Sequence, residues 1–171
     1  MIRFILVVFL TVINAYSFSY IITTKELNEN IEKKFPLEKK IFFSKFVFSH
    51  PQLTIDKKSD LILFACDTQS SSFILKDGST PVFRIYARSD IKYDGENIYL
   101  KKIKIDKIKN NHLSEKLEKK LTLAVELLLN VYFSKKPIYK LKNTSYTMQT
   151  VNSVITDVVI DNEVIKVLIL E

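Results

Sequence analysis

The sequence predicts an α+β domain in which a curved antiparallel sheet wraps around one long helix in the C-terminal half of the chain. Residues 112–134 contain no Gly or Pro and become apolar on almost every side in their second half, and such a helix has to be enclosed. Most other segments have the residue patterns of strands, and short turns join them in order, which favours antiparallel pairing. The length of 171 residues suits a single domain, which we place at residues 20–171.

The chain begins with the pattern of a secretory signal peptide, which we assign to residues 1–19. Arg3 gives a positive start, residues 4–13 are apolar, and Ser17 and Ser19 are small residues at the spacing that cleavage requires. We therefore expect export to the periplasm or the cell envelope. An uncleaved N-terminal anchor is the alternative, because large side chains flank the cleavage point. No Cys follows the apolar segment, so the chain is not expected to carry a lipid on an N-terminal Cys.

A short helix is predicted directly after the signal. Thr23 and Glu26 form the S/T-x-x-E pattern of a capping box. Leu27 and Ile31 then fall on one face of the helix, and Pro36 ends it. The other positions are mostly polar, so we expect this helix to lie on the surface of the domain.

The middle of the chain is predicted to form successive strands. Residues 40–50 hold four Phe residues spread over both faces, and residues 61–67 form a second apolar run. Residues 82–90 alternate between apolar and polar side chains, and an Asp-Gly pair on each side of them marks a hairpin turn. Residues 98–105 form the next strand, whose apolar side chains change parity at the Lys101–Lys102 pair. That slip predicts a β-bulge.

The long helix follows these strands and ends before Pro137. Its first half carries apolar residues at helical spacing, namely Leu113, Leu117, Leu121, Ala124 and Leu128. Its second half is interrupted by three polar residues, Thr122, Glu126 and Asn130. The apolar run is too short and too interrupted to span a bilayer, so the sheet is its expected cover. Residues 155–160 and 164–170 are then predicted to form a final hairpin.

Three blocks of the sequence together resemble one family. They are ITTKELN at residues 22–28, NIYLK at residues 97–101 and YFSKKPIYKL at residues 132–141. Their order and spacing are similar to those of the YceB-like envelope lipoproteins, a domain of unknown function, over nearly all of residues 20–171. The resemblance implies a curved sheet around a long helix, similar to the tubular lipid-binding domains that hold acyl chains between helix and sheet. It implies no catalytic residues.

The chain departs from that family at one point. Members usually place a Cys just after the signal for lipid attachment, whereas Ser17-Phe18-Ser19-Tyr20 stands here. Membrane anchoring by that route is therefore not expected.

Residue types that support catalysis or metal binding are sparse. The two histidines are His50 and His112, and there is no Gly-x-Ser-x-Gly pattern, so neither a Ser-His-Asp triad nor a metal site is expected. The single cysteine, Cys66, lies in an apolar run and is expected to be a buried, inert thiol. We therefore expect no enzyme activity, no metal and no cofactor.

The formal net charge of +7 bears on the partners of the protein. Nucleic acid is not an expected partner of an exported chain, whereas an anionic membrane surface or a cell-wall polymer suits the charge. The lysines are spread along the chain, so plain solvation of the surface is the other interpretation.

The high content of Phe, at 12 residues, and of Tyr, at 8 residues, leaves two interpretations open. An apolar helix against a Phe-rich sheet is either a packed core or a groove left open for an acyl chain or similar apolar ligand. The candidate wall residues of such a groove are Phe46, Phe48, Phe83, Ile85, Leu100, Ile103, Val125, Leu128 and Tyr132. The candidate contacts for an anionic head group are Arg84, Lys101 and Lys102.

Two functions follow from these interpretations. The first is an exported, non-enzymatic protein of the cell envelope that binds a lipid or other apolar ligand between helix and sheet. The alternative is an envelope interaction or scaffold protein with a closed core, which would display an exposed apolar patch.

Overall fold

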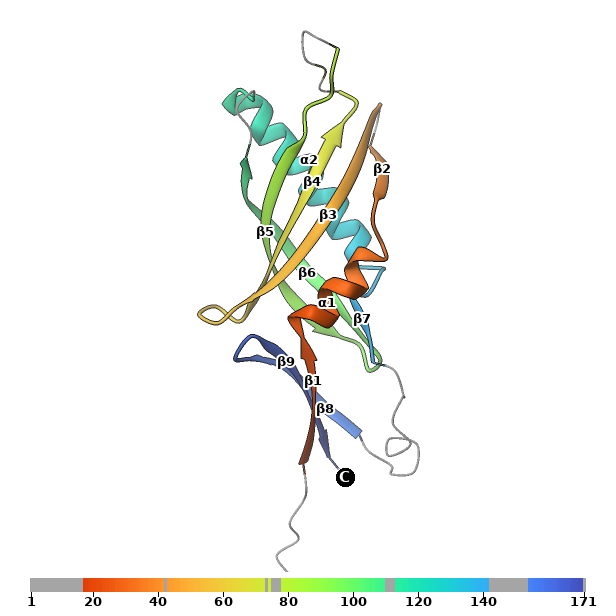
Figure 1. Ribbon diagram of the computed structural model, residues 1–171, viewed down its shortest axis with the longest axis vertical. Helices are drawn as coiled ribbons and strands as arrows, with labels where there is room; N and C mark the ends of the chain where they lie inside the picture. Colours follow the sequence, from red (N-terminus) through yellow and green to blue (C-terminus); the bar gives the residue numbers. More distant parts are fainter. Residues whose placement is uncertain are drawn as a thin grey trace, which may run out of the picture.

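Strands dominate the architecture, and they form two separate antiparallel sheets (Figure 1). The computed structural model describes residues 17–41, 43–72, 74, 78–109, 113–141 and 154–170. The larger sheet has the order β2-β3-β4-β5-β6-β7 and the smaller one the order β1-β9-β8. The elements are β1 (Ser17–Thr23), α1 (Thr24–Glu32), β2 (Leu37–Ile41), β3 (Ser44–Asp56), β4 (Leu61–Ser70), β5 (Phe83–Tyr93), β6 (Asn97–Lys109), α2 (Glu115–Phe133), β7 (Tyr139–Lys140), β8 (Val154–Asp161) and β9 (Val164–Leu170).

The predicted α+β class, with one curved sheet wrapped around a long helix, is wrong. The described chain is mostly β, and its strands form two sheets. Helix α2 packs against β6 and the edge strand β2, and Figure 1 shows it running behind β3, β4 and β5. Only one of its faces is buried, through Leu121, Val125, Leu129 and Phe133. The prediction failed because apolar residues on every side of a helix were read as a sign of enclosure, whereas the outer side of α2 is exposed.

The short N-terminal helix is confirmed. Thr23 is its N-cap, the Thr23 backbone N–H donates to Glu26 Oε2 at 2.8 Å, and the Glu26 backbone N–H donates to Thr23 Oγ1 at 3.2 Å. These two bonds satisfy donors that a helix N-terminus leaves unpaired. Leu27 and Ile31 are both fully buried, as their spacing predicted.

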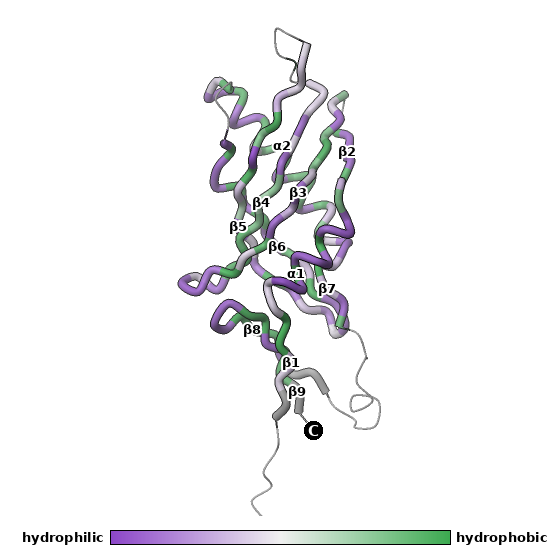
Figure 2. The backbone as a smooth tube through the Cα atoms, viewed as in Figure 1, coloured by the Kyte–Doolittle hydropathy of each residue, from purple (hydrophilic) through white to green (hydrophobic). Residues whose placement is uncertain are grey.

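The predicted β-bulge and the antiparallel hairpins are also confirmed. Strands β5 and β6 are joined at the Asp94–Gly95 turn, and their register shifts between the pairs Arg88–Lys104 and Asp90–Lys101. Lys102 lies in the shifted segment with a φ of 54°, which is the left-handed region that a bulge can require. Strands β8 and β9 form the final hairpin. In Figure 2 the turns of the β3–β4 and β8–β9 hairpins are hydrophilic, while green segments follow the strands.

Two Asn side chains cover backbone edges of the larger sheet. Asn130 of α2 accepts from the Ile103 N–H at 2.9 Å and donates to the Ile103 carbonyl at 2.8 Å. Asn28 of α1 does the same for Leu53 of β3, at 2.7 and 2.8 Å. Each side chain thus replaces a neighbouring strand at a position where β6 or β3 has none beside it in the described part of the chain. Glu126 extends the cover by accepting from the Ile105 N–H at 3.1 Å.

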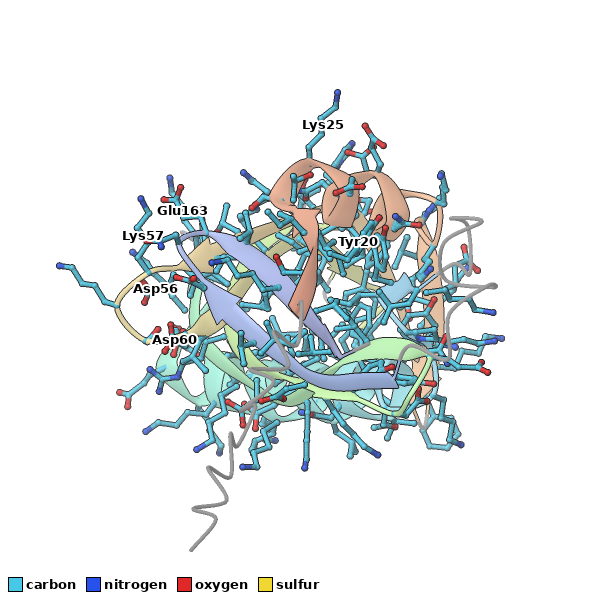
Figure 3. The ribbon with its side chains drawn as sticks, turned by 90° about the horizontal axis from the view of Figure 1, so that it is seen from below. Tyr20, Lys25, Asp56, Lys57, Asp60 and Glu163 are labelled. Atoms are coloured by element: carbon cyan, nitrogen blue, oxygen red, sulfur yellow. The ribbon has the colours of Figure 1, made fainter. Side chains whose placement is uncertain are left out.

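The smaller sheet joins the larger one through shared core residues and polar contacts. Ile22, Ile165 and Val167 are fully buried and belong to the same hydrophobic cluster as the larger sheet. The tips of two hairpins meet where Lys57 Nζ lies 3.2 Å from Glu163 Oε1, and Figure 3 shows these two side chains together.

The predicted signal falls mainly on residues outside the described range, as does His112. Ser17, at the start of β1, pairs with Leu170, and Ser19 pairs with Leu168. The predicted cleavage point after Ser19 therefore lies inside β1.

Candidate functional site

The residues predicted to line an internal groove lie together, but they pack against one another. Seven of them have side chains that are 3% exposed or less, namely Phe46, Phe48, Phe83, Ile85, Leu100, Ile103 and Val125. Leu128 and Tyr132 are partly buried against the same cluster. Burial of this extent is typical of a close-packed protein interior. A binding surface is therefore expected on the outside of the molecule.

The three predicted head-group contacts do not gather at one place. Arg84 lies opposite Lys109 in the β5–β6 register, whereas Lys101 lies opposite Asp90, six residues further along β5. At about 3.3 Å per residue, that separation is roughly 20 Å. Arg84 is moreover held by Asp67, whose Oδ1 atom is 3.0 Å from its guanidinium. Lys102 pairs with Asp90 at 3.4 Å.

The outer side of α2 carries an exposed apolar stripe. Leu123, Leu127 and Val131 follow one another at steps of four residues, and their side chains are 70%, 54% and 51% exposed. Residues four apart lie one above the other on a helix, so the three side chains form one continuous surface. A soluble helix normally has polar residues on the side away from the core, whereas α2 has aliphatic residues there from Leu123 to Val131.

Lysines border the stripe at both ends. Lys116 and Lys120 precede it on the same side of α2, and Lys135 and Lys136 follow in the turn after the helix, all of them exposed. None of these four has an ion-pair partner among the described residues. Lys119, by contrast, is paired with Glu115 at 2.7 Å. We call the set Lys116, Lys120, Leu123, Leu127, Val131, Lys135 and Lys136 the α2 outer face.

The sequence did contain the signal for this face. The spacing of Leu123, Leu127 and Val131 marks a second apolar stripe on the helix, on the side opposite Leu121, Val125 and Leu129. Because apolar residues on every side of a helix predict enclosure, both stripes were expected to be buried, and the predicted site lay inside the molecule.

Candidate ligands for a metal ion do not gather in the part of the chain that the structure describes: no group of three or more His, Cys, Asp or Glu side chains is placed to hold an ion there. Cys66 is fully buried, as predicted. Its thiol lies 3.7 Å from Thr68 Oγ1, and burial raises its pKa to about 12.

A chemical test follows for Cys66. At about pH 8 a free cysteine is partly thiolate, but the buried thiol should stay protonated and shielded, and only the thiolate is nucleophilic. We expect no reaction with Ellman's reagent in the folded protein and one reacting thiol after unfolding in urea. Fast reaction of the native protein would show that Cys66 is accessible.

The structure thus defines a mostly β protein with two antiparallel sheets, a packed core and an apolar helix face open to solvent. No helix within the described ranges is both long and apolar enough to cross a membrane. The family described as "Protein of unknown function (DUF1439)" matches residues 22–163, and the chain belongs to this family. Comparison with curated proteins found no match. The closer likeness to YceB-like lipoproteins, and the link to lipid binding, remain predictions.

Proposed function

We propose that the protein is an exported, non-enzymatic protein of the cell envelope that docks on an anionic phospholipid surface through the α2 outer face. The observation that carries the proposal is the exposed stripe of Leu123, Leu127 and Val131 between unpaired lysines. A helix with aliphatic residues and flanking cations suits the interface of a bilayer, where the aliphatic groups enter the acyl region and the cations remain at the head groups.

The charge of the chain favours a membrane over a neutral partner surface. The formal net charge is +7, and loss of Arg3 with the signal would leave a charge of +6. Each Lys close to an anionic leaflet contributes about 1 kcal/mol, and each buried CH₂ group contributes about 0.8 kcal/mol. Three aliphatic side chains and four lysines therefore suffice for reversible binding without a covalent lipid.

The test is co-flotation of the protein with vesicles. We expect binding to phosphatidylcholine vesicles that contain phosphatidylglycerol, and weak or no binding to phosphatidylcholine alone. Replacing Leu123, Leu127 and Val131 together by Ser should weaken binding at least tenfold, because about 1.4 kcal/mol, less than two buried CH₂ groups, already gives a factor of ten. Added salt should weaken the binding of the unaltered protein, because it screens exposed charges.

A matched variant controls for a general loss of apolar surface. Leu63, Ile74 and Val82 are also exposed, at 39%, 67% and 53%, but belong to β4 and to the connection between β4 and β5. Their replacement by Ser should leave flotation unchanged. The proposal is refuted if the unaltered protein does not float with either vesicle, or if both triple variants float as it does. In the latter case a protein partner would be the better occupant of the face.

A further inference from the structure

A second candidate site lies at the edge of β3, in a gap between two elements that cover this edge. Strand β2 pairs with β3 only as far as Phe48, and the Asn28 side chain binds the backbone of Leu53. Between these points, residues 49–52 border a hollow of about 790 Å³. Its other wall is formed by Glu32, Phe35 and Pro36. Small-molecule sites typically have about 300–1,000 Å³, and we call this hollow the His50 pocket.

The backbone of the pocket is strained. The β3–β4 register shifts between Ser49 and Gln52, so His50 and Pro51 form a bulge. His50 has a φ of 47°, in the left-handed region that few residues other than Gly adopt, although His does so more often than most. Strain of this kind persists only where the surroundings impose it, and it is concentrated at functional sites. Here the bulge turns the His50 side chain outward, where it is 79% exposed.

Asp67 and Arg84 hold the polar groups of the pocket in place. Asp67 Oδ2 lies 3.0 Å from His50 Nδ1, and Asp67 Oδ1 accepts from Arg84 at 3.0 Å. Arg84 also donates to the His50 carbonyl at 3.0 Å and to Gln52 Oε1 at 3.2 Å. The His50 imidazole, the bulge and the Gln52 amide are thus held in place before any ligand binds. Such preorganisation is typical of binding sites.

The remaining hydrogen-bonding capacity defines the ligand. Because a carboxylate only accepts, Nδ1 of a neutral His50 carries the proton and Nε2 is a free acceptor. The Glu32 carboxylate has no partner among the described residues, the Gln52 amide retains its NH₂ donor, and the Ser49 hydroxyl can serve in either role. Arg84 is neutralised by Asp67, and Glu32 adds an uncompensated negative charge, so an anionic ligand is disfavoured.

Phe35 supplies a flat apolar surface beside these groups. Phe35 is half-buried, and its ring centroid lies 6.4 Å from that of the buried Phe64. The pocket thus has an aromatic surface surrounded by two acceptors, a donor and a hydroxyl group. A matching ligand has a flat apolar face and hydroxyl groups along its edge. That is the chemistry of a pyranose ring. We propose that the His50 pocket binds a neutral saccharide.

The pocket is independent of the α2 outer face. Phe64 faces Phe133 of α2, with ring centroids 5.7 Å apart, whereas Asp67, three residues along the same strand, points to the opposite side of the sheet. The pocket lining and the α2 outer face share no residue. Either binding activity can be lost while the other persists.

The test is titration of the ¹⁵N-labelled protein with N,N′-diacetylchitobiose, a neutral disaccharide, and separately with glycerol phosphate. We expect amide shifts at Ser49, His50 and Gln52 and a change in the His50 imidazole signals with the sugar, with a Kd of about 1 mM or tighter. Glycerol phosphate should cause no such shifts. Glu32→Ala and Gln52→Ala should each weaken sugar binding at least fivefold. Glu29→Ala is the matched control, because Glu29 lies on the same helix, is not part of the pocket lining and pairs with Lys25 at 3.9 Å.

A variant that relieves strain separates binding from folding. Gly adopts positive φ without penalty, so His50→Gly should keep or raise the thermal unfolding midpoint while it weakens sugar binding at least fivefold. Three results would overturn the proposal: no shift at residues 49–52 with the disaccharide, equal binding by the Glu32, Gln52 and Glu29 variants, or shifts produced by glycerol phosphate instead. Vesicle flotation of the same variants should be unchanged.

Discussion

Replacing Phe48 by Ala is expected to lower the free energy of unfolding by about 3–5 kcal/mol. Phe48 is fully buried, its ring stacks on Phe46 with centroids 6.3 Å apart, and Leu37 lies opposite it in the β2–β3 register. Truncation in a close-packed core loses the transfer energy of the ring and leaves a cavity. In an open groove the ring would already border empty space, and its loss would cost far less.

Phe43→Ala provides the matched control for this measurement. Phe43 lies in the turn between β2 and β3 and is fully exposed, so the same chemical change should alter stability by no more than about 0.5 kcal/mol. Urea denaturation of both variants gives the comparison. If Phe48→Ala changed the free energy of unfolding as little as Phe43→Ala, the space between sheet and helix would not be filled. The internal groove would then again be a candidate ligand site.

Local chemistry made parts of this fold predictable. The capping box of α1 needs only Thr23 and Glu26, three residues apart. The β5–β6 hairpin is predicted by Asp94 and Gly95 at its turn. The bulge at Lys102 could be predicted because an extra residue in a strand shifts the parity of every side chain after it. Each of these features is determined by residues that are close in the sequence.

The arrangement of these elements could not be predicted in the same way. Strand β1 pairs with β9, so Thr23 lies opposite Val164. The residues next to Thr23 in the sequence do not indicate this pairing. The same holds for α2, because whether Leu127 is covered depends on where distant strands run. The His50 pocket was missed for a related reason: Glu32, His50 and Arg84 meet only when β3, β5 and α1 are assembled.

The polar residues that interrupt α2 show how a local signal can be visible and still be misread. Glu126 and Asn130 are four residues apart and therefore lie on one side of the helix. They appeared as breaks in an apolar run, whereas in the structure they bind the free backbone edge of β6. A polar pair at helical spacing within an apolar helix can thus indicate an uncovered strand edge beside it.

Asn130→Ala is expected to lower the free energy of unfolding by about 2–4 kcal/mol. The change removes both partners of Ile103, whose side chain is only 1% exposed, and a buried backbone group without a partner costs about 1–3 kcal/mol. The amide of Ile103 should also exchange its hydrogen faster, which NMR hydrogen exchange would detect. Asn30→Ala is the control, because the Asn30 side chain donates to the Glu26 carbonyl of its own helix, at 2.8 Å, and binds no strand among the described residues.

Asn28 covers the other edge of the sheet in the same way, which provides a second variant for the same measurement. Asn28 binds Leu53 of β3 as Asn130 binds Ile103 of β6, and each also donates to the carbonyl four residues earlier in its helix. Asn28→Ala should therefore cost a similar amount and should expose the Leu53 amide instead. Because the two Asn residues lie on different helices and share no hydrogen-bond partner, the double variant should lose the sum of the two effects. Single variants as stable as the unaltered protein would show that neither side chain covers a sheet edge in solution.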